Sequence, residues 1–177
     1  MTPNMTTIFD GIVFSHYGQA YIHFKGTYDY AENVRLGQVN GLLGAVQATT
    51  LFLTFGLHTG NVRLCIKVSE QEPAVDDSWE EIVEASFIMS EGKELGLSDW
   101  NGEIWQPIPI AAGSYRVRYS ACRFNEAEDL PESDNEPEPI ERYEVIFWQA
   151  PYQADKILKV TTPSAQYWHD VAQGKAR

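Results

Sequence analysis

The residues of this chain whose types suit catalysis or metal binding are its four histidines and two cysteines. His16 and His58 both lie in turn-like stretches beside a glycine, and no two histidines show the HxH or HxxxH spacing typical of metal ligands. If the fold brings His16 and His58 to one end, a nearby carboxylate would complete a metal site and support a metal-assisted enzyme. The alternative is that both histidines bond to groups of their own loops.

Cys65 and Cys122 fall in predicted strands with no base beside them, so we interpret them as structural thiols rather than nucleophiles. Glu80 and Glu81 are adjacent, and adjacent strand residues point to opposite faces, which excludes them as a glycosidase pair. The chain contains no glycine-rich phosphate loop and no nucleophile motif between strand and helix. The sequence therefore predicts a non-enzymatic protein with no catalytic residues, no metal and no cofactor.

Arg116 and Arg118 form the most conspicuous basic pair in an acidic protein. They alternate with Tyr115, Val117 and Tyr119 in the stretch GSYRVRYSAC (113–122), so the apolar residues face one side of a strand and the arginines the other. Together with Trp148 and neighbouring aromatics, the arginines would suit a small-molecule or carbohydrate site.

A structural role for the arginines is the other interpretation. Residues 142–148 also alternate and follow the same loop, which predicts a long hairpin with 113–122. Glu144 would then lie across from Arg116 or Arg118 as an exposed ion pair worth only about 0.2–1 kcal/mol.

The elements that must position these residues are short strands. Alternating or β-rich stretches separated by turn signals predict strands at 7–14, 20–25, 49–55, 61–68, 80–89, 114–122, 142–148 and 156–161. Two prolines place 104–110 at an edge or outside the sheet, and 49–55 with 61–68 resembles an antiparallel hairpin. We predict one all-β domain over residues 1–177, a two-sheet antiparallel β-sandwich of about eight or nine strands with a short C-terminal helix near 165–172.

The charge of the chain is its most unusual property. It carries 25 Asp and Glu against 13 Lys and Arg, a formal net charge of −12, which opposes direct binding to nucleic acid. Residues 126–141 contain eight acids, three prolines and no base, and are expected to form a mobile acidic loop.

Together with a second acidic stretch at 70–84, this loop favours a basic protein partner. The alternative is two separately solvated acidic segments. The residues that we expect to bind the partner are Asp76, Asp77, Glu80, Glu128, Asp129, Glu132, Asp134 and Glu136.

No apolar run approaches the roughly 20 residues of a membrane span, and the first residues lack the pattern of a signal peptide. We therefore expect a cytoplasmic protein that does not bind membranes. The oligomeric state does not follow from the pattern.

Two family resemblances add to these expectations. GLHTG (56–60), GSYRVRYSA (113–121) and RYEVIFWQAP (142–151) resemble an uncharacterised bacterial family. Ser15-His16-Tyr17 before a strand, the acidic stretch 29–32, the apolar strand near 50–55 and the strand 108–119 are similar in order to the competence protein J (ComJ) family. That resemblance implies an inhibitor of a DNA-degrading nuclease and names no functional residue here.

Overall fold

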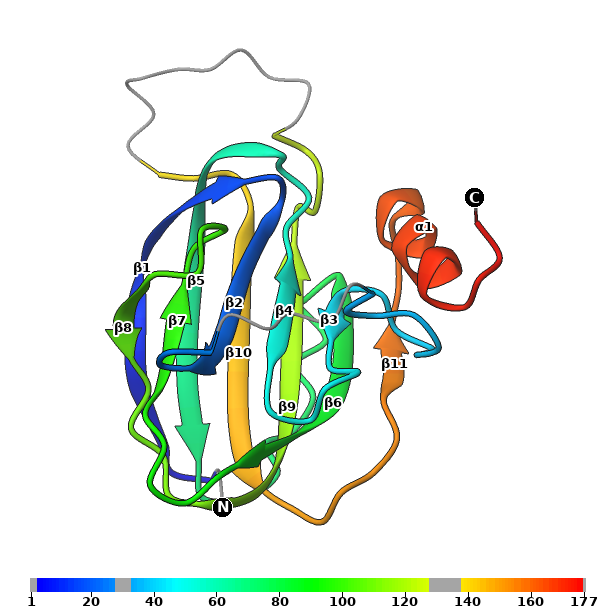
Figure 1. Cartoon of the computed structure of the whole chain (residues 1–177). Helices are drawn as coiled ribbons and strands as arrows, with labels where there is room; N and C mark the ends of the chain where they lie inside the picture. The colour runs from blue at the N-terminus through cyan, green and yellow to red at the C-terminus, as the bar shows by residue number, and fades with distance from the viewer. Residues whose placement is uncertain (1–2, 28–32, 128–137, 177) are drawn as a thin grey trace.

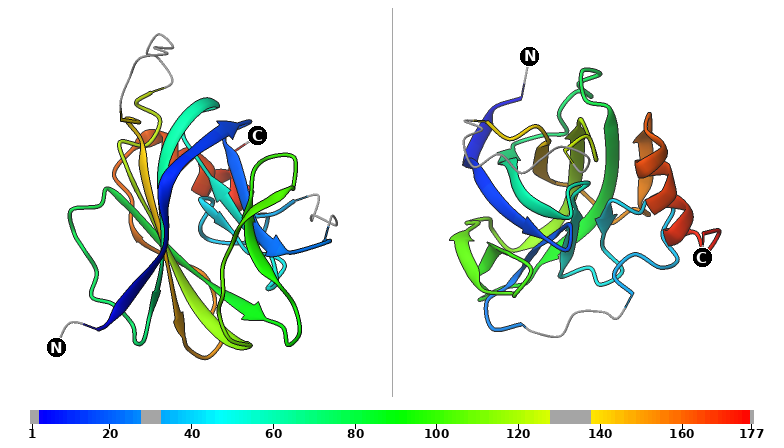
Figure 2. Two further views of the ribbon diagram at one scale, coloured as in Figure 1. Left: turned by 90° about the vertical axis from the view of Figure 1, so that its left-hand side faces the viewer. Right: turned by 90° about the horizontal axis from the view of Figure 1, so that it is seen from above.

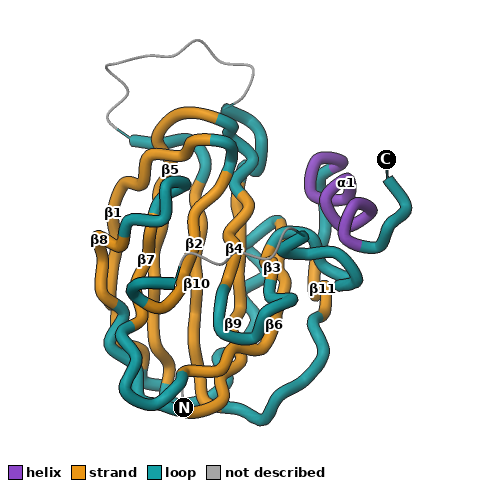
Figure 3. Tube along the Cα trace, in the orientation of Figure 1, coloured by secondary structure: helices purple, strands orange, loops and turns teal. Residues whose placement is uncertain are grey.

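The computed structural model describes residues 3–27, 33–127 and 138–176, and they form a β-protein with one helix (Figures 1 and 3). The elements are β1 Met5–His16, β2 Gln19–Phe24, β3 Leu43–Gly44, β4 Leu51–Thr54, β5 Thr59–Ser69, β6 Glu81–Met89, β7 Leu95–Ser98, β8 Ile104–Pro107, β9 Gly113–Cys122, β10 Arg142–Gln149, β11 Lys156–Lys159 and α1 Pro163–Ala172. The all-β class, the C-terminal helix and the predicted strands are confirmed. No helix in the described part of the chain is long and apolar enough to span a bilayer.

The strands join into one continuous curled sheet. Its order is β11-β6-β9-β10-β5-β1-β2-β4-β3, with β7 added to β2 and β8 added to β7. The predicted long hairpin of β9 and β10 is confirmed, and β8 pairs only with β7 among the described strands, as expected of an edge. The predicted two-sheet antiparallel sandwich is not confirmed, because the sheet is continuous and β10 runs parallel to β5.

The expected hairpin of 49–55 with 61–68 is wrong. β5 lies between β1 and β10, whereas β4 pairs with β2 and β3, so consecutive strands belong to different parts of the sheet. A two-residue turn at Tyr17 and Gly18, both with positive φ, joins β1 to β2 and turns the chain between these parts.

The hydrophobic core lies where the sheet curls over itself (Figure 2). Alternate residues of the central strands point into it, as their sequence pattern predicts. Val62, Leu64 and Ile66 of β5 are fully buried there, together with Val117 of β9 and Val145 of β10. Buried residues of β2, β4 and β7 belong to the same core cluster.

Helix α1 packs beside the chain that precedes β3. Thr162 caps its first turn by accepting a hydrogen bond from the Ala165 N–H, and Pro163 follows the cap. The buried His169 accepts a hydrogen bond at Nδ1 from the Gly41 N–H over 2.9 Å. A Cβ atom at Gly41 would lie 1.8 Å from the Trp168 carbonyl oxygen, so this close approach requires glycine.

Candidate partner-binding surface

One end of the curled sheet gathers loops that are distant in sequence (Figure 1). The β1–β2 turn, the β4–β5 loop at 55–58, the chain after β9 and the chain before β10 all meet there. The Gly18 N–H donates to the His58 carbonyl, and the Ser15 hydroxyl donates to the Leu57 carbonyl over 2.8 Å. These loops form a platform, and the two described ends of the acidic stretch, 126–127 and 138–141, both lie on it.

Buried Glu141 holds this platform together. Its Oε2 accepts from the Leu57 N–H over 2.9 Å and from the Tyr143 hydroxyl, whose oxygen in turn accepts from the Gly56 N–H. Burial raises the pKa of the Glu141 carboxyl, against the opposing effect of these donors. Glu141 thus acts as an anchor of the β4–β5 loop and is shielded from solvent.

The two acidic stretches approach each other at Arg123. The Arg123 N–H donates to Glu80 over 2.8 Å, and its guanidinium pairs with Glu126 at 2.9 Å. Asp76 and Asp77 are exposed on the segment that leads to Glu80. A hydrogen bond from Ser78 lowers the pKa of the Asp76 carboxyl, which keeps its charge at neutral pH.

At the other side of the acidic loop, Arg63 of β5 binds two carboxylates. It pairs with Asp10 of β1 at 3.0 Å and with Glu138 at 3.1 Å. Five of the predicted partner-binding residues lie outside the described residues, as does the acidic stretch 29–32; the five are Glu128, Asp129, Glu132, Asp134 and Glu136. Their role stays a prediction.

The histidines of the two loops do meet at this end. The rings of His16 and His58 lie 6.0 Å apart, and each Nδ1 lies within hydrogen-bond distance of the Thr59 hydroxyl. Tyr17 and Trp100 pack against His16 and complete an aromatic patch. Among the described residues no three His, Cys, Asp or Glu side chains come together as a metal site would require.

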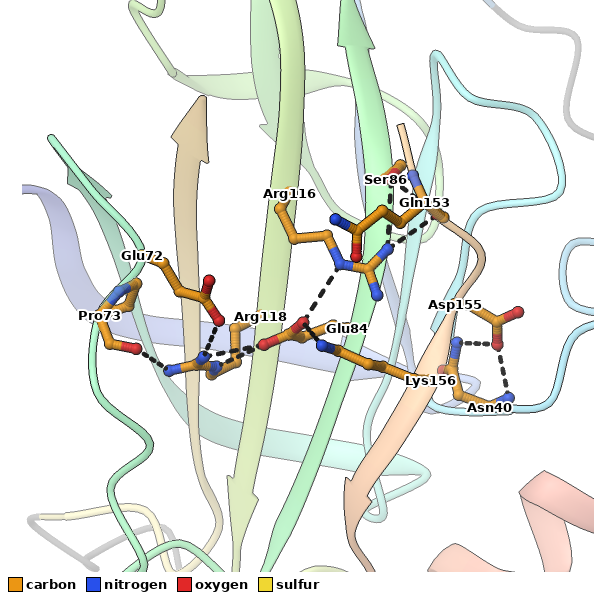
Figure 4. A network of polar contacts seen from close by, with 10 residues as sticks. All are labelled: Asn40, Glu72, Pro73, Glu84, Ser86, Arg116, Arg118, Gln153, Asp155 and Lys156. Atoms are coloured by element: carbon orange, nitrogen blue, oxygen red, sulfur yellow. Dashed lines mark hydrogen bonds and ion pairs between the residues drawn. The ribbon is translucent and has the colours of Figure 1, made fainter. Parts of the chain in front are cut away.

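The arginine pair is buried, contrary to the expected exposed face. Arg116 and Arg118 both bind Glu84 of β6, and Lys156 of β11 adds a third cation to the same carboxylate at 3.1 Å (Figure 4). The Arg118 guanidinium lies 5.3 Å from the ring of Trp148. The segments around Pro73 and Gln153 cover this face and accept further hydrogen bonds from the arginines.

Glu144 is not the partner of these arginines. It lies opposite Ser120 in the β9–β10 register and pairs with Lys67 of β5 instead. A cavity of about 980 Å³ lies elsewhere, where Lys25, Met89, Trp105 and Ile108 line it, and not beside the arginines. The donors of Arg118 and the Nε and Nη1 donors of Arg116 are therefore used inside the protein, and Nη2 of Arg116 is buried without a hydrogen-bond partner among the described residues.

Two residues of this arrangement were missed in the sequence. Glu84 lies on the same face of β6 as Ile82 and Ile88, and alternation alone does not show that the segment around Pro73 covers this face. Glu141 was counted as part of the mobile loop, although it directly precedes the alternating stretch of β10. The available signal was an acidic residue directly before a strand and two residues from Tyr143.

No family model and no curated protein matches the sequence.

Two solved structures share the fold. One is described as crocagin biosynthetic gene J, with a TM-score of 0.54, 10% identity, and 84% of this chain and 99% of the other covered. The second is ComJ from Bacillus subtilis, described as an inhibitor of the DNA-degrading activity of NucA. Its TM-score is 0.55 at 9% identity, with 83% of this chain and 99% of ComJ covered. At these identities the likeness establishes the fold, and the predicted resemblance to the ComJ family is confirmed at that level.

Proposed function

We propose that this chain is a non-enzymatic, cytoplasmic, single-domain protein that binds a basic protein and inhibits it, with a nuclease as the leading candidate. The observation that carries the proposal is the meeting of the two acidic stretches, where Glu80 and Glu126 share Arg123 at the end that bears the acidic loop. The net charge of −12 supports the same partner class, because it speeds encounter with a cationic surface.

The partner-binding residues of the proposal are Asp76, Asp77 and Glu80, together with Glu128, Asp129, Glu132, Asp134 and Glu136 of the acidic loop. The fold shared with ComJ supports an inhibitory role, since ComJ is described as inhibiting a DNA-degrading activity. Inhibition by this chain would require only that its charged end cover the basic active-site surface of the partner.

The test begins with capture of binding proteins from a lysate of the native host at about 50 mM and about 500 mM salt, which bracket strong and weak screening. The captured protein is then purified, its affinity is measured by calorimetry, and its nuclease activity is assayed with and without this chain. We expect a basic protein that is retained at low salt only and whose DNA cleavage is inhibited.

Matched variants locate the binding surface. Asp76→Asn with Asp77→Asn and Glu80→Gln removes three charges from the loop end and is expected to weaken binding at least tenfold. Glu70→Gln with Glu91→Gln and Glu94→Gln removes three exposed charges near the opposite end and is expected to leave binding within about threefold, since distant charges are screened. Equal effects of both triple variants, or no retained basic protein, would contradict the proposal.

A further inference from the structure

Strand β1 has one open edge. It pairs with β5 along its whole length, from Met5 opposite Ser69 to His16 opposite Thr59. On its other side the described residues provide a single paired position, His16 with Gln19 of β2. Figure 2 shows β1 crossing the side of the molecule, in front of the strands to which it is joined.

The direction of the backbone groups follows from the neighbouring strand. The Arg63 N–H of β5 donates to the Glu141 carbonyl at the start of β10, so the backbone of Arg63 faces away from β1. Ile12 lies opposite Arg63. In an antiparallel pair, two residues that face each other either both hydrogen-bond to each other or both point their backbone groups away. Because the Arg63 backbone points away from β1, the Ile12 N–H and C=O point to the open edge. By the alternation of the strand, those of Asp10 and Phe14 do so as well.

Exposed apolar side chains accompany this edge. Ile12 is 50% exposed and Phe14 is 56% exposed on the outer face of β1. On the inner side of the same edge, the ring of Phe9 contacts Trp105 of β8 edge-on at 5.3 Å, and Trp105 is itself partly exposed. A strand added here would therefore meet apolar contacts on both of its faces.

The edge has little of the usual protection against pairing. Natural edge strands are shortened or carry lysine, proline or bulges. β1 has 12 residues without lysine or proline, and its one register shift lies near its start, between Thr7 and Phe9. Asp10 is the only charged residue on the strand.

The charges around the open edge of β1 favour a cationic segment as the strand that binds there. Arg63, the residue opposite Ile12, forms ion pairs with both Asp10 and Glu138. Two carboxylates therefore surround one cation beside the open edge. A second copy of the chain would bring another −12 and the same carboxylates, which disfavours self-pairing. A cationic strand meets complementary charge.

We infer that the open edge of β1 binds an extended segment of the basic partner by strand addition, with Lys or Arg alternating with apolar residues. The apolar residues would face Phe9 and Trp105. The basic residues would lie over Ile12 and Phe14 with their aliphatic stems and reach Asp10 and Glu138 with their charges. This inference rests on the proposed function and names the partner's binding element.

The probe for this inference is a synthetic peptide of about twelve residues that alternates Lys and Val, matching the length of β1. NMR of the labelled protein measures amide exchange and peptide affinity. We expect slower exchange by about tenfold or more at the amides of Asp10, Ile12 and Phe14. The same peptide with N-methylated alternate residues, and one with Glu in place of Lys, should each bind at least tenfold more weakly.

Substitutions on the open edge separate backbone pairing from side-chain contact. Ile12→Pro removes an N–H that points away from β5, a position where edge strands tolerate proline, and should weaken peptide binding at least tenfold. Ile12→Ser keeps the N–H and should remain within about threefold. Circular dichroism confirms that both variants stay folded, and Phe14→Pro provides a second test if Ile12→Pro does not fold.

Each result decides for or against the inference. Absence of peptide binding, equal affinity for the N-methylated peptide, or unchanged binding by a folded proline variant would overturn it. So would a dimer of the chain alone that Ile12→Pro converts to a monomer, because a second copy would then occupy the edge. If the partner is still retained by a folded Ile12→Pro variant, the inference fails while the proposed function stands; if no basic partner exists, the proposed function fails.

Discussion

At the scale of single residues, two buried arginines share one buried carboxylate, that of Glu84. Glu84 accepts from Nε and Nη2 of Arg118 at 3.0 and 2.9 Å and from Nε of Arg116 at 3.2 Å. Burial by itself would raise the pKa of Glu84, but the hydrogen bonds from Arg118 and Lys156 lower it below its usual value. The stability from this group is therefore present above the unfolded pKa and is lost as the pH falls through the folded one.

Replacing Glu84 is expected to be among the most damaging changes of a charged residue. Glu84→Gln leaves Arg116 and Arg118 buried without their counter-charge, which costs about 3–5 kcal/mol in the free energy of unfolding. Glu94→Gln, at the exposed pair with Lys25, is the control and should cost about 1 kcal/mol or less. Urea unfolding measures both, and similar losses would show that the buried network is not special.

His169 gives the stability a pH dependence. Burial lowers its pKa below the ordinary 6.5, against the smaller opposing effect of Asp170 and Asp155. The unfolded chain takes up a proton below pH 6.5 while the folded chain resists it, so stability is full above 6.5 and falls as the pH drops toward the folded pKa.

We expect His169→Gln to flatten this dependence. The free energy of unfolding of the unmodified protein should fall below pH 6.5 by up to about 1.4 kcal/mol per pH unit for each such histidine. His23, whose pKa burial also lowers, retains its own share in the variant. Denaturant titrations between about pH 5 and 7.5 measure the slopes; identical slopes would rule out His169 as a contributor.

The burial of Arg116 and Arg118 could not be predicted from their own strand. Alternation placed them correctly on the face opposite Tyr115, Val117 and Tyr119, but the residues that cover that face come from segments 37 to 45 positions away. Coverage by irregular loops leaves no periodic signal. Alternation predicts Glu144 as the local partner on the neighbouring strand, but the register of the two strands places Glu144 opposite Ser120, where it pairs with Lys67 instead.

At the scale of elements, helix α1 depends on one close backbone approach. Gly41→Ala would place a Cβ 1.8 Å from the Trp168 carbonyl oxygen and so force the helix away from the 38–41 turn. We expect a loss of about 3 kcal/mol or more and faster proteolysis after residue 160. Gly92→Ala is the control, because open space surrounds its Cβ and only its positive φ resists, at about 1 kcal/mol.

The positions of the strands could be predicted from the sequence because period-two alternation is a local property. The pairing of the strands could not be predicted in the same way. Thr49–Phe55 and Asn61–Val68 are close in sequence, so a hairpin was the simplest expectation, but β1 and β10 occupy both edges of β5. Glu141 and Tyr143 fix the intervening loop in place, and these contacts span more than 80 positions.

At the scale of the whole molecule, the proposed function predicts that charge governs association with the partner. For the captured basic partner, we expect the association rate to fall at least about tenfold from 50 to 500 mM salt, while the dissociation rate changes less. The Asp76, Asp77 and Glu80 triple variant should show a weaker salt dependence in stopped-flow measurements. A salt-independent association rate would contradict the electrostatic role.

The parallel pair of β5 and β10 sets the order in which the chain can fold. The two strands are about 80 positions apart, and β10 lies between β5 and β9 in the finished sheet. During synthesis, β5 therefore cannot pair with β10 until residues 142–149 have left the ribosome. A chain that ends at residue 141 should remain unfolded by circular dichroism, and full-length refolding should be slow, in the range of milliseconds to seconds.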